Sequence, residues 1–309
     1  MTAETQLPQV GGATKRRLPA RNWLQRRSLL AYTLLAYGIT WSILIGTVFA
    51  IQYGLLAPDT PVLGLAADAA VYGPAVAALL VLAATQGRAG VLPWLRSIVR
   101  WRVGVRWYLF VLLGVPLLTL VGATFLYGAL PFQSLAVQWT ALLTRFAPLI
   151  LLTALTTGLG EEPGWRGFAL PNLQQRHGPL LGTLLLSLLW AFWHLPNLVL
   201  QPSGTATFGL WFLATMVNAF VLTWVYNCTG GSVLLVILLH ATQNSTSRLV
   251  ANLVGATDPV QFQNDYSLIT VFTFGLLMAI VIAATHGRLG YRAAAPLNGE
   301  NQVETSSRS

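Results

Sequence analysis

The chain has 309 residues, of which 55% are hydrophobic and only 9% are charged. Soluble domains average about 25% charged residues, so this composition excludes a soluble globular protein and indicates an integral membrane protein. The formal net charge is +9, but the basic residues cluster beside apolar runs, which argues against nucleic acid and favours anionic lipids as partners. A single cysteine, Cys228, excludes an intramolecular disulfide.

The order of polar and apolar segments predicts an all-α, polytopic membrane protein. Residues 1–28 form a basic cytoplasmic tail, residues 29–286 a transmembrane domain, and residues 287–309 a disordered cytoplasmic tail. A helix needs about 20 apolar residues to cross a bilayer. About eight runs approach or exceed this length, at 29–55, 69–86, 107–130, 146–174, 179–200, 207–228, 231–250 and 266–286. Whether 131–145 lies in the membrane interface is left open.

The distribution of basic residues predicts that both termini are cytoplasmic in a multi-pass protein of the cell membrane. Cytoplasmic loops are enriched in Lys and Arg. With the N-terminus inside, the outer side keeps only Arg145 and Arg248. The remaining sixteen of the eighteen basic residues fall inside, at Lys15, Arg16, Arg17, Arg21, Arg26, Arg27, Arg88, Arg96, Arg100, Arg102, Arg106, Arg166, Arg176, Arg288, Arg292 and Arg308.

Polar side chains that interrupt the apolar runs are concentrated in the second half of the chain. Glu161 and Glu162 stand side by side on the fourth run, in a chain with only nine acidic residues. A carboxylate at membrane depth costs roughly 2.5–3.5 kcal/mol on insertion scales and is usually functional. His194 lies on the fifth run. His240 and Asn244 share one helix face on the seventh, because they are four residues apart.

The acidic pair is followed by a basic residue at helical spacing. Glu162 and Arg166 are also four residues apart, so the guanidinium neutralises one carboxylate if the helix continues past Pro163. A proline kinks a membrane helix and frees a backbone carbonyl, which is tolerated where the kink lines a cavity. The stretch is therefore expected to border a polar cavity.

The three helices can bring these groups to one site. A rise of about 1.5 Å per residue puts Glu161, His194 and His240 at depths of about 8, 22 and 14 Å from the cytoplasmic face of a core about 30 Å thick. Helix boundaries read from sequence are uncertain by about 2–4 residues. A shared site in the inner half of the membrane is compatible with these depths.

Two chemistries suit this set of side chains. Two adjacent carboxylates do not easily both ionise in a low dielectric, so one can act as a base or acid near neutrality. A carboxylate with a histidine can activate water for attack on a carbonyl, while a second histidine and an amide donate to the oxyanion. Alternatively, Glu161, His194 and His240 form a ligand set of the catalytic zinc type. The residues alone leave both open.

Three motifs in this region resemble those of the CPBP family, which comprises CAAX-type prenyl-protein endopeptidases and bacteriocin-processing or immunity proteins. They are EEPGWRGFALPNLQ from Glu161, WAFWHLP containing His194, and His240-x-x-x-Asn244. The resemblance covers 146–250, and each motif falls on a predicted span in the family's order. One departure is Trp190, where the family usually has Phe; because an aromatic ring is kept, we expect a difference in packing rather than loss of activity.

The resemblance implies an intramembrane endopeptidase whose helices enclose an active-site cavity and which cleaves a peptide bond near the cytoplasmic side. It implies that Glu161 and His194 activate water and that His240 and Asn244 stabilise the oxyanion. Glu162 and Arg166 would support the site. Family members are described as metal-dependent and as metal-independent, so Zn²⁺ stays open. The substrate would be a membrane protein or peptide, prenylated or not.

Two alternatives from other classes use the same polar residues. A transporter could relay protons or ions through them, although no inverted repeat is visible in the sequence. A catalytically silent relative could act as an immunity or scaffold protein, although none of the family's catalytic positions is substituted. Asn218 and Gln243 are interpreted as interhelical hydrogen-bonding residues.

Overall fold

The computed structural model describes residues 23–57, 59–196 and 204–292. Most of the predicted terminal tails, at 1–28 and 287–309, lies outside these ranges. Regular structure within the described residues is entirely helical, which confirms the all-α class. The helices are α1 (Trp23–Arg26), α2 (Ser28–Gln52), α3 (Val62–Val71), α4 (Gly73–Gln86), α5 (Arg88–Ile98), α6 (Val105–Leu109), η1 (Phe110–Gly114), α7 (Val115–Tyr127), α8 (Leu130–Val137), η2 (Leu142–Phe146), α9 (Ala147–Thr153), η3 (Ala154–Gly158), α10 (Leu159–Gly164), η4 (Trp165–Ala169), α11 (Leu170–Trp193), α13 (Gly204–Cys228), α14 (Val233–Val254) and α15 (Pro259–Ala284).

The described residues include five helices that are long and apolar enough to cross a membrane, or six if the bent pair α3–α4 is one span. The predicted count of eight is therefore not confirmed. Two features account for the difference. The continuous run Leu142–Trp193 counts once, although Gly178 within it has non-helical φ and ψ angles of 75° and 174°. Helix α14 has 22 residues but is not among the spans, and it carries several polar side chains along its length.

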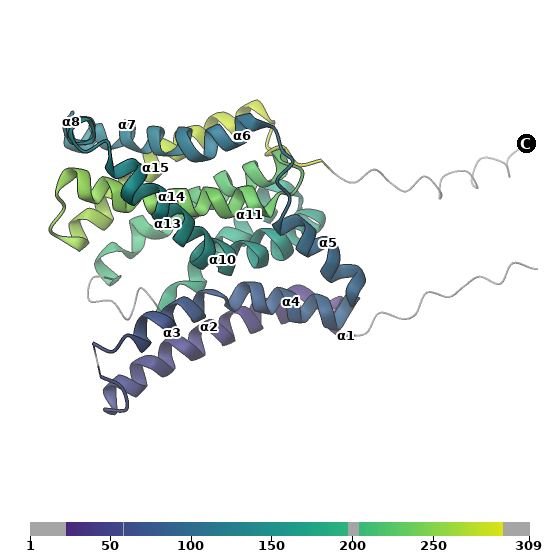
Figure 1. Cartoon of the computed structure of the whole chain (residues 1–309). Coiled ribbons are helices and arrows are strands. Elements are labelled where there is room, and N and C mark those ends of the chain that lie inside the picture. The colour runs from purple at the N-terminus through teal and green to yellow at the C-terminus, as the bar shows by residue number, and fades with distance from the viewer. Residues whose placement is uncertain (1–22, 58, 197–203, 293–309) are drawn as a thin grey trace, which may run out of the picture.

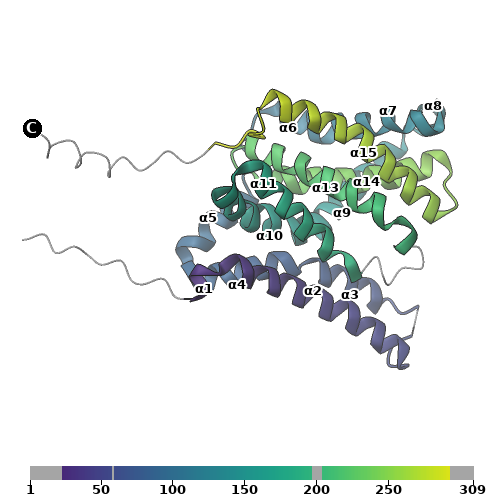
Figure 2. The same cartoon turned by 180° about the vertical axis from the view of Figure 1, so that it is seen from behind.

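The long helices lie side by side in a bundle with two distinct ends (Figures 1 and 2). The start of α2 and the end of α15 lie at one end, on the right in Figure 1. Arg26, Arg27 and Arg176 line one pocket there, and Arg100 donates to the Gly230 carbonyl at 2.6 Å. We call this the basic end. The opposite end, called the far end, holds the α2–α3 and α14–α15 connections and α8.

Local sequence signals fix both ends of α14, which carries two of the predicted site residues. Ser232 caps its N-terminus by accepting from the Leu235 N–H, and its hydroxyl donates to the Arg100 carbonyl at 2.6 Å. Gly255 ends the helix with φ 64°, a conformation that glycine adopts without steric cost. Asp258 then caps α15 by accepting from two N–H groups of its first turn. Because Ser232 contacts Arg100 at the basic end and Gly255 leads into the α14–α15 connection at the far end, α14 runs from the basic end to the far end.

The acidic motif lies on a helix that packs very closely against its neighbour. A Cβ on Gly160 would come within 2.8 Å of the Val71 carbonyl oxygen, and one on Gly164 within 2.5 Å of the Pro74 backbone. Small residues four apart allow such close approach between membrane helices. The two glycines therefore turn toward the α3–α4 junction and leave another face of α10 for the carboxylates.

Candidate active site

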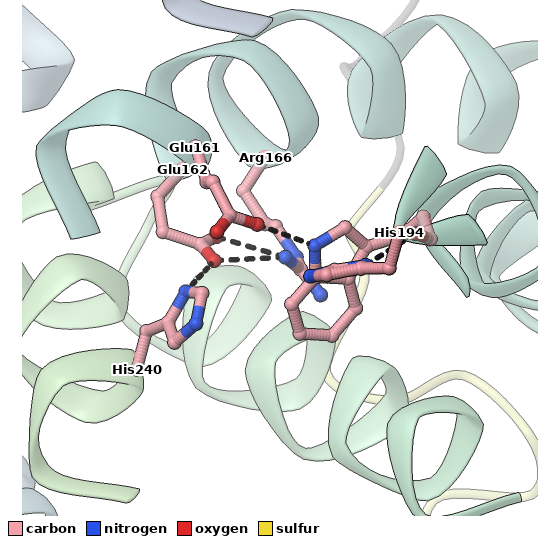
Figure 3. Close-up of polar contacts among 6 residues, drawn as sticks. Glu161, Glu162, Arg166, His194 and His240 are labelled. Atoms are coloured by element: carbon pink, nitrogen blue, oxygen red, sulfur yellow. Dashed lines mark hydrogen bonds and ion pairs between the residues drawn. The ribbon is translucent and has the colours of Figure 1, made fainter. Parts of the chain in front are cut away.

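A buried charged group joins α10, η4 and α14 (Figure 3). Arg166 Nη1 donates to both carboxylate oxygens of Glu162, at 2.9 and 3.0 Å, and both side chains are fully buried. The same carboxylate accepts from His240 Nδ1 at 2.7 Å. The predicted pairing of Glu162 with Arg166 is thus present, and His240 is its third member. Removing one partner of a buried ion pair costs about 3–5 kcal/mol.

The chain continues as a helix beyond Pro163, but with π-helical geometry over η4. Proline lacks an N–H, so the normal hydrogen-bond ladder is interrupted at this point. The carbonyl of Pro163 itself accepts a hydrogen bond from the Trp94 indole N–H at 2.9 Å. Single π-helical turns are frequent at functional sites. The π-helical turn η4 keeps Arg166 on the same side of the helix as Glu162. The hydrogen bond from Trp94 to the Pro163 carbonyl, which the sequence does not predict, holds the start of this turn.

Trp190 connects Glu161 to His194. Its indole N–H donates to Glu161 Oε2 at 2.6 Å, and its backbone carbonyl lies 2.8 Å from His194 Nδ1. A carbonyl oxygen only accepts hydrogen bonds, so Nδ1 of His194 carries the proton. In the neutral ring, Nε2 then keeps a free lone pair. One residue therefore orients both members of the predicted water-activating pair.

Aromatic rings hold these polar groups in place. The Arg166 guanidinium lies over the Trp190 ring, 4.4 Å from its centroid, which is within the range of a cation–π contact. The His194 ring meets Trp193 and Trp211 edge to face, with centroids 4.7 and 5.1 Å apart. These contacts restrict the imidazole, which matters because catalytic groups lose efficiency when they are free to reorient.

One cavity collects the predicted residues. Its volume is 320 Å³, and its lining includes Glu161, His194, His240 and Asn244. Three of these come from different helical segments that sequence reasoning had placed at different depths. Glu162 does not line the cavity but lies behind it, bonded to Arg166. The rest of the lining is largely polar, with Thr157, Thr215, Asn218, Ser247, Arg248, Gln263 and Ser267 among its members.

Comparison with known proteins finds a family model that matches the region of the site. Residues 143–246 fit the family model described as type II CAAX prenyl endopeptidase Rce1-like. The segment that carries the three motifs is thus similar to this family, in agreement with the CPBP resemblance. The chain is also similar to "CAAX prenyl protease 2" of Methanococcus maripaludis, with 29% identity over 116 residues. That match covers 35% of this chain and 42% of the relative, so it spans about two fifths of the relative's length.

The motif-bearing segment contains a further polar contact that the sequence did not predict. Trp190 was interpreted as a packing difference, yet its indole N–H is the hydrogen-bond donor to Glu161. Phenylalanine, the usual residue at this position in the family, has no such donor. The available signal was the tryptophan itself, because a buried indole N–H usually finds a partner. The interpretation of Gln243 and Asn218 as interhelical hydrogen-bonding residues is confirmed, and the structure adds that they bond to each other, Gln243 Nε2 donating to Asn218 Oδ1 at 3.0 Å.

The side chains of this site do not gather into a metal-ligand set. Within the described ranges, no group of three or more His, Cys, Asp or Glu residues has the arrangement needed to hold a metal ion. The hydrogen bonds of the site engage one atom of each predicted ligand, His240 Nδ1, His194 Nδ1 and Glu161 Oε2, and a second nitrogen or oxygen of each is still able to bind a metal. It is the placement of Glu161, His194 and His240, and not these bonds, that does not form a zinc-ligand set as arranged. No step below is derived through a metal.

Proposed function

We propose that the protein is an intramembrane endopeptidase that hydrolyses a peptide bond of a membrane-associated protein or peptide. The observation that supports this most directly is the shared cavity of Glu161, His194, His240 and Asn244. Hydrolysis of an amide needs an activated water and donors for the oxyanion. The cavity offers candidates for both, and the Rce1-like match agrees with this reaction class.

Water activation is assigned to Glu161 and His194. Glu161 Oε2 is held by Trp190, and its other oxygen can accept a proton from a water in the cavity. His194 has its Nδ1 proton directed to the Trp190 carbonyl, so its Nε2 lone pair can accept a hydrogen bond from the same water. As the water oxygen bonds to the carbonyl carbon, its proton passes to Glu161. That proton then goes to the leaving amine as the C–N bond breaks.

Oxyanion stabilisation is assigned to His240 and Asn244. The amide of Asn244 can donate directly. His240 already donates Nδ1–H to Glu162, so it can donate from Nε2 only when both ring nitrogens are protonated. In that form the charges of His240 and Arg166 balance those of Glu161 and Glu162. Placing a donor where negative charge develops is usually the largest single contribution to catalysis.

The proposal includes a membrane location and a lipid-associated substrate. The long apolar helices indicate a multi-pass membrane protein, and the cell membrane is its proposed location. The name of the archaeal relative suggests a prenylated protein as one substrate class, which we carry over as part of the proposal. Anionic lipids are proposed to bind the clustered arginines of the basic end.

The test is cleavage of quenched fluorescent peptides by purified protein in liposomes. One peptide carries a prenylated C-terminal CAAX sequence, and its twin is identical but unprenylated. Wild type is expected to cleave at least one of them, and Glu161→Ala and His194→Ala to cleave neither. If both variants cleave as fast as wild type, the protease assignment fails. Cleavage of neither peptide by wild type, together with ion flux that depends on Glu161, would instead support the transporter alternative.

A further inference from the structure

The exposed fraction of the cavity-lining side chains increases toward the far end of the bundle. Along one face of α14, His240 is 5% exposed, whereas Asn244 and Arg248, one and two turns further on, are exposed. The same trend holds on the acidic segment, where Glu161 is 2% exposed and Thr157, one turn closer to the far end, is partly exposed. The cavity therefore deepens from the far end toward the catalytic groups.

The other side of the catalytic groups is closed by the protein core. Arg166 and Trp165 are fully buried immediately after the acidic pair, and Leu235 and Leu239 are fully buried on the turns of α14 before His240. Trp165 and both leucines belong to the same hydrophobic cluster, which fills the bundle toward the basic end. Interiors of this kind are packed too densely for a water path. Among the described residues, the cavity is therefore closed toward the basic end, and its exposed lining lies on the far-end side.

The distribution of arginines indicates which end of the bundle faces the cytoplasm. The basic end carries arginines from three separate parts of the chain. They are Arg26, Arg27, Arg100 and Arg176. At the far end, Arg248 at the cavity mouth lines a second pocket together with Arg145. Because Lys and Arg are enriched on the cytoplasmic side of membrane proteins, the basic end faces the cytoplasm.

We propose that the active-site cavity opens to the extracytoplasmic side of the membrane, so that the substrate is a peptide segment presented there. The term substrate in this proposal rests on the proposed function. The direction in which the cavity opens can be measured whether or not the protein is an enzyme. It differs from the cytoplasmic-side cleavage that the sequence resemblance implies. The two conclusions differ because they rest on different observations. The order of the spans gives only an estimate of the depth of Glu161 in the membrane. The side to which the cavity opens depends on which helical turns next to Glu161 and His240 are buried.

The experiment uses single-cysteine variants in intact cells, because a membrane-impermeant maleimide reacts only with a thiol that water reaches. The native Cys228 is first replaced by Ser. Ser247→Cys then places a thiol at the cavity mouth, and His177→Cys places the matched control on the exposed turn of α11 at the basic end. Heat-denatured samples of each variant give the maximum labelling against which the signal is scaled.

The expected result is labelling of Ser247→Cys in intact cells and labelling of His177→Cys only after permeabilisation. The proposal is overturned if Ser247→Cys requires permeabilisation or if His177→Cys does not. Labelling requires no proteolysis, so either pattern leaves the endopeptidase assignment untouched. Conversely, failure of all peptide cleavage would remove the proposed function and leave the measured direction of the opening intact.

Discussion

Glu162 Oε1 and His240 Nδ1 lie 2.7 Å apart, although 78 positions separate them in the chain. Glu162 is also bound by Arg166, so its carboxylate is shared by two helical segments and faces away from the cavity. Its neighbour Glu161 lines the cavity and, among the described residues, has one side-chain hydrogen-bond partner, Trp190. Adjacent and chemically identical residues therefore have different surroundings, and in the proposed function Glu162 holds the bundle together while Glu161 takes part in the reaction.

This division predicts different outcomes for two isosteric substitutions. Glu162→Gln leaves Arg166 buried without its counter-charge, so we expect a loss of about 3–5 kcal/mol in the free energy of unfolding. Glu161→Gln keeps an oxygen for the Trp190 N–H, so it should change stability by less than about 1 kcal/mol while abolishing cleavage. Chemical unfolding in detergent measures the first effect and peptide cleavage the second. Equal destabilisation by both substitutions would contradict the assignment.

Much of the candidate site is predictable from the sequence, because it depends on short-range spacing. A separation of four residues puts Glu162 beside Arg166, and His240 beside Asn244, on one face of a helix. Charged and polar groups are costly at membrane depth, so the apolar runs that carry them are expected to pack against one another. The family motifs then supply the grouping. The helical class of the fold follows from the length of the apolar runs, since only helices or closed barrels satisfy backbone hydrogen bonds in lipid and a spanning strand needs only about 9–11 residues.

Other features depend on tertiary packing and are not encoded in spacing. The polar side chains of α14 keep it out of the spans when each helix is judged separately, whereas the break at Gly178 falls where the sequence predicts one run to end and the next to begin. The role of Trp190 requires knowing that its ring is directed toward Glu161. The direction of the cavity requires the exposure of turns on both sides of His240. Each of these is a relation between segments that are distant in the chain.

Trp190→Phe tests the link between the two water-activating residues. The substitution removes the N–H that donates to Glu161 Oε2 and keeps an aromatic ring beneath Arg166. A hydrogen bond to a charged group contributes about 1.5–3 kcal/mol, so a fall of about tenfold to hundredfold in kcat is expected if its loss misorients the carboxylate. The measurement is steady-state cleavage of the peptide that wild type accepts.

The matched control for this change is Trp193→Phe. Trp193 is also buried, but its indole N–H has no hydrogen-bond partner within the described part of the chain. Removing that N–H should therefore leave kcat within about threefold of wild type, since no hydrogen bond is lost. An equal loss of activity in both variants would mean that ring packing, and not the bond to Glu161, supports catalysis.

Asn244→Ala removes one proposed oxyanion donor without touching the buried charged group. Asn244 lines the cavity and is exposed, so its truncation should leave the free energy of unfolding within about 0.5 kcal/mol of wild type. Loss of an oxyanion donor lowers kcat by about 100-fold or more. The peptide assay at saturating substrate measures this effect. An unchanged kcat would remove Asn244 from the oxyanion site.

Chelation tests the metal-free arrangement of the cavity. Among the described residues, no three His, Cys, Asp or Glu side chains are placed to hold a metal ion. We therefore expect cleavage to continue at the wild-type rate after dialysis against a strong chelator, with no gain when Zn²⁺ is returned. Loss of activity on chelation and its recovery with zinc would show that the side chains rearrange into a ligand set.

Gly164→Ala tests whether close helix packing is needed to present the carboxylates. An added Cβ would lie 2.5 Å from Pro74 backbone atoms, which cannot yield, so α10 must move away from α4. Overpacking of this kind costs about 1–3 kcal/mol, and cleavage should fall because Glu161 moves with the helix. Gly38→Ala is the control, since nothing lies within 4 Å of its added Cβ; it should stabilise α2 by about 0.5–1 kcal/mol. Thermal unfolding and cleavage of both variants decide the matter, and wild-type behaviour of Gly164→Ala would show that the helices can separate without affecting the site.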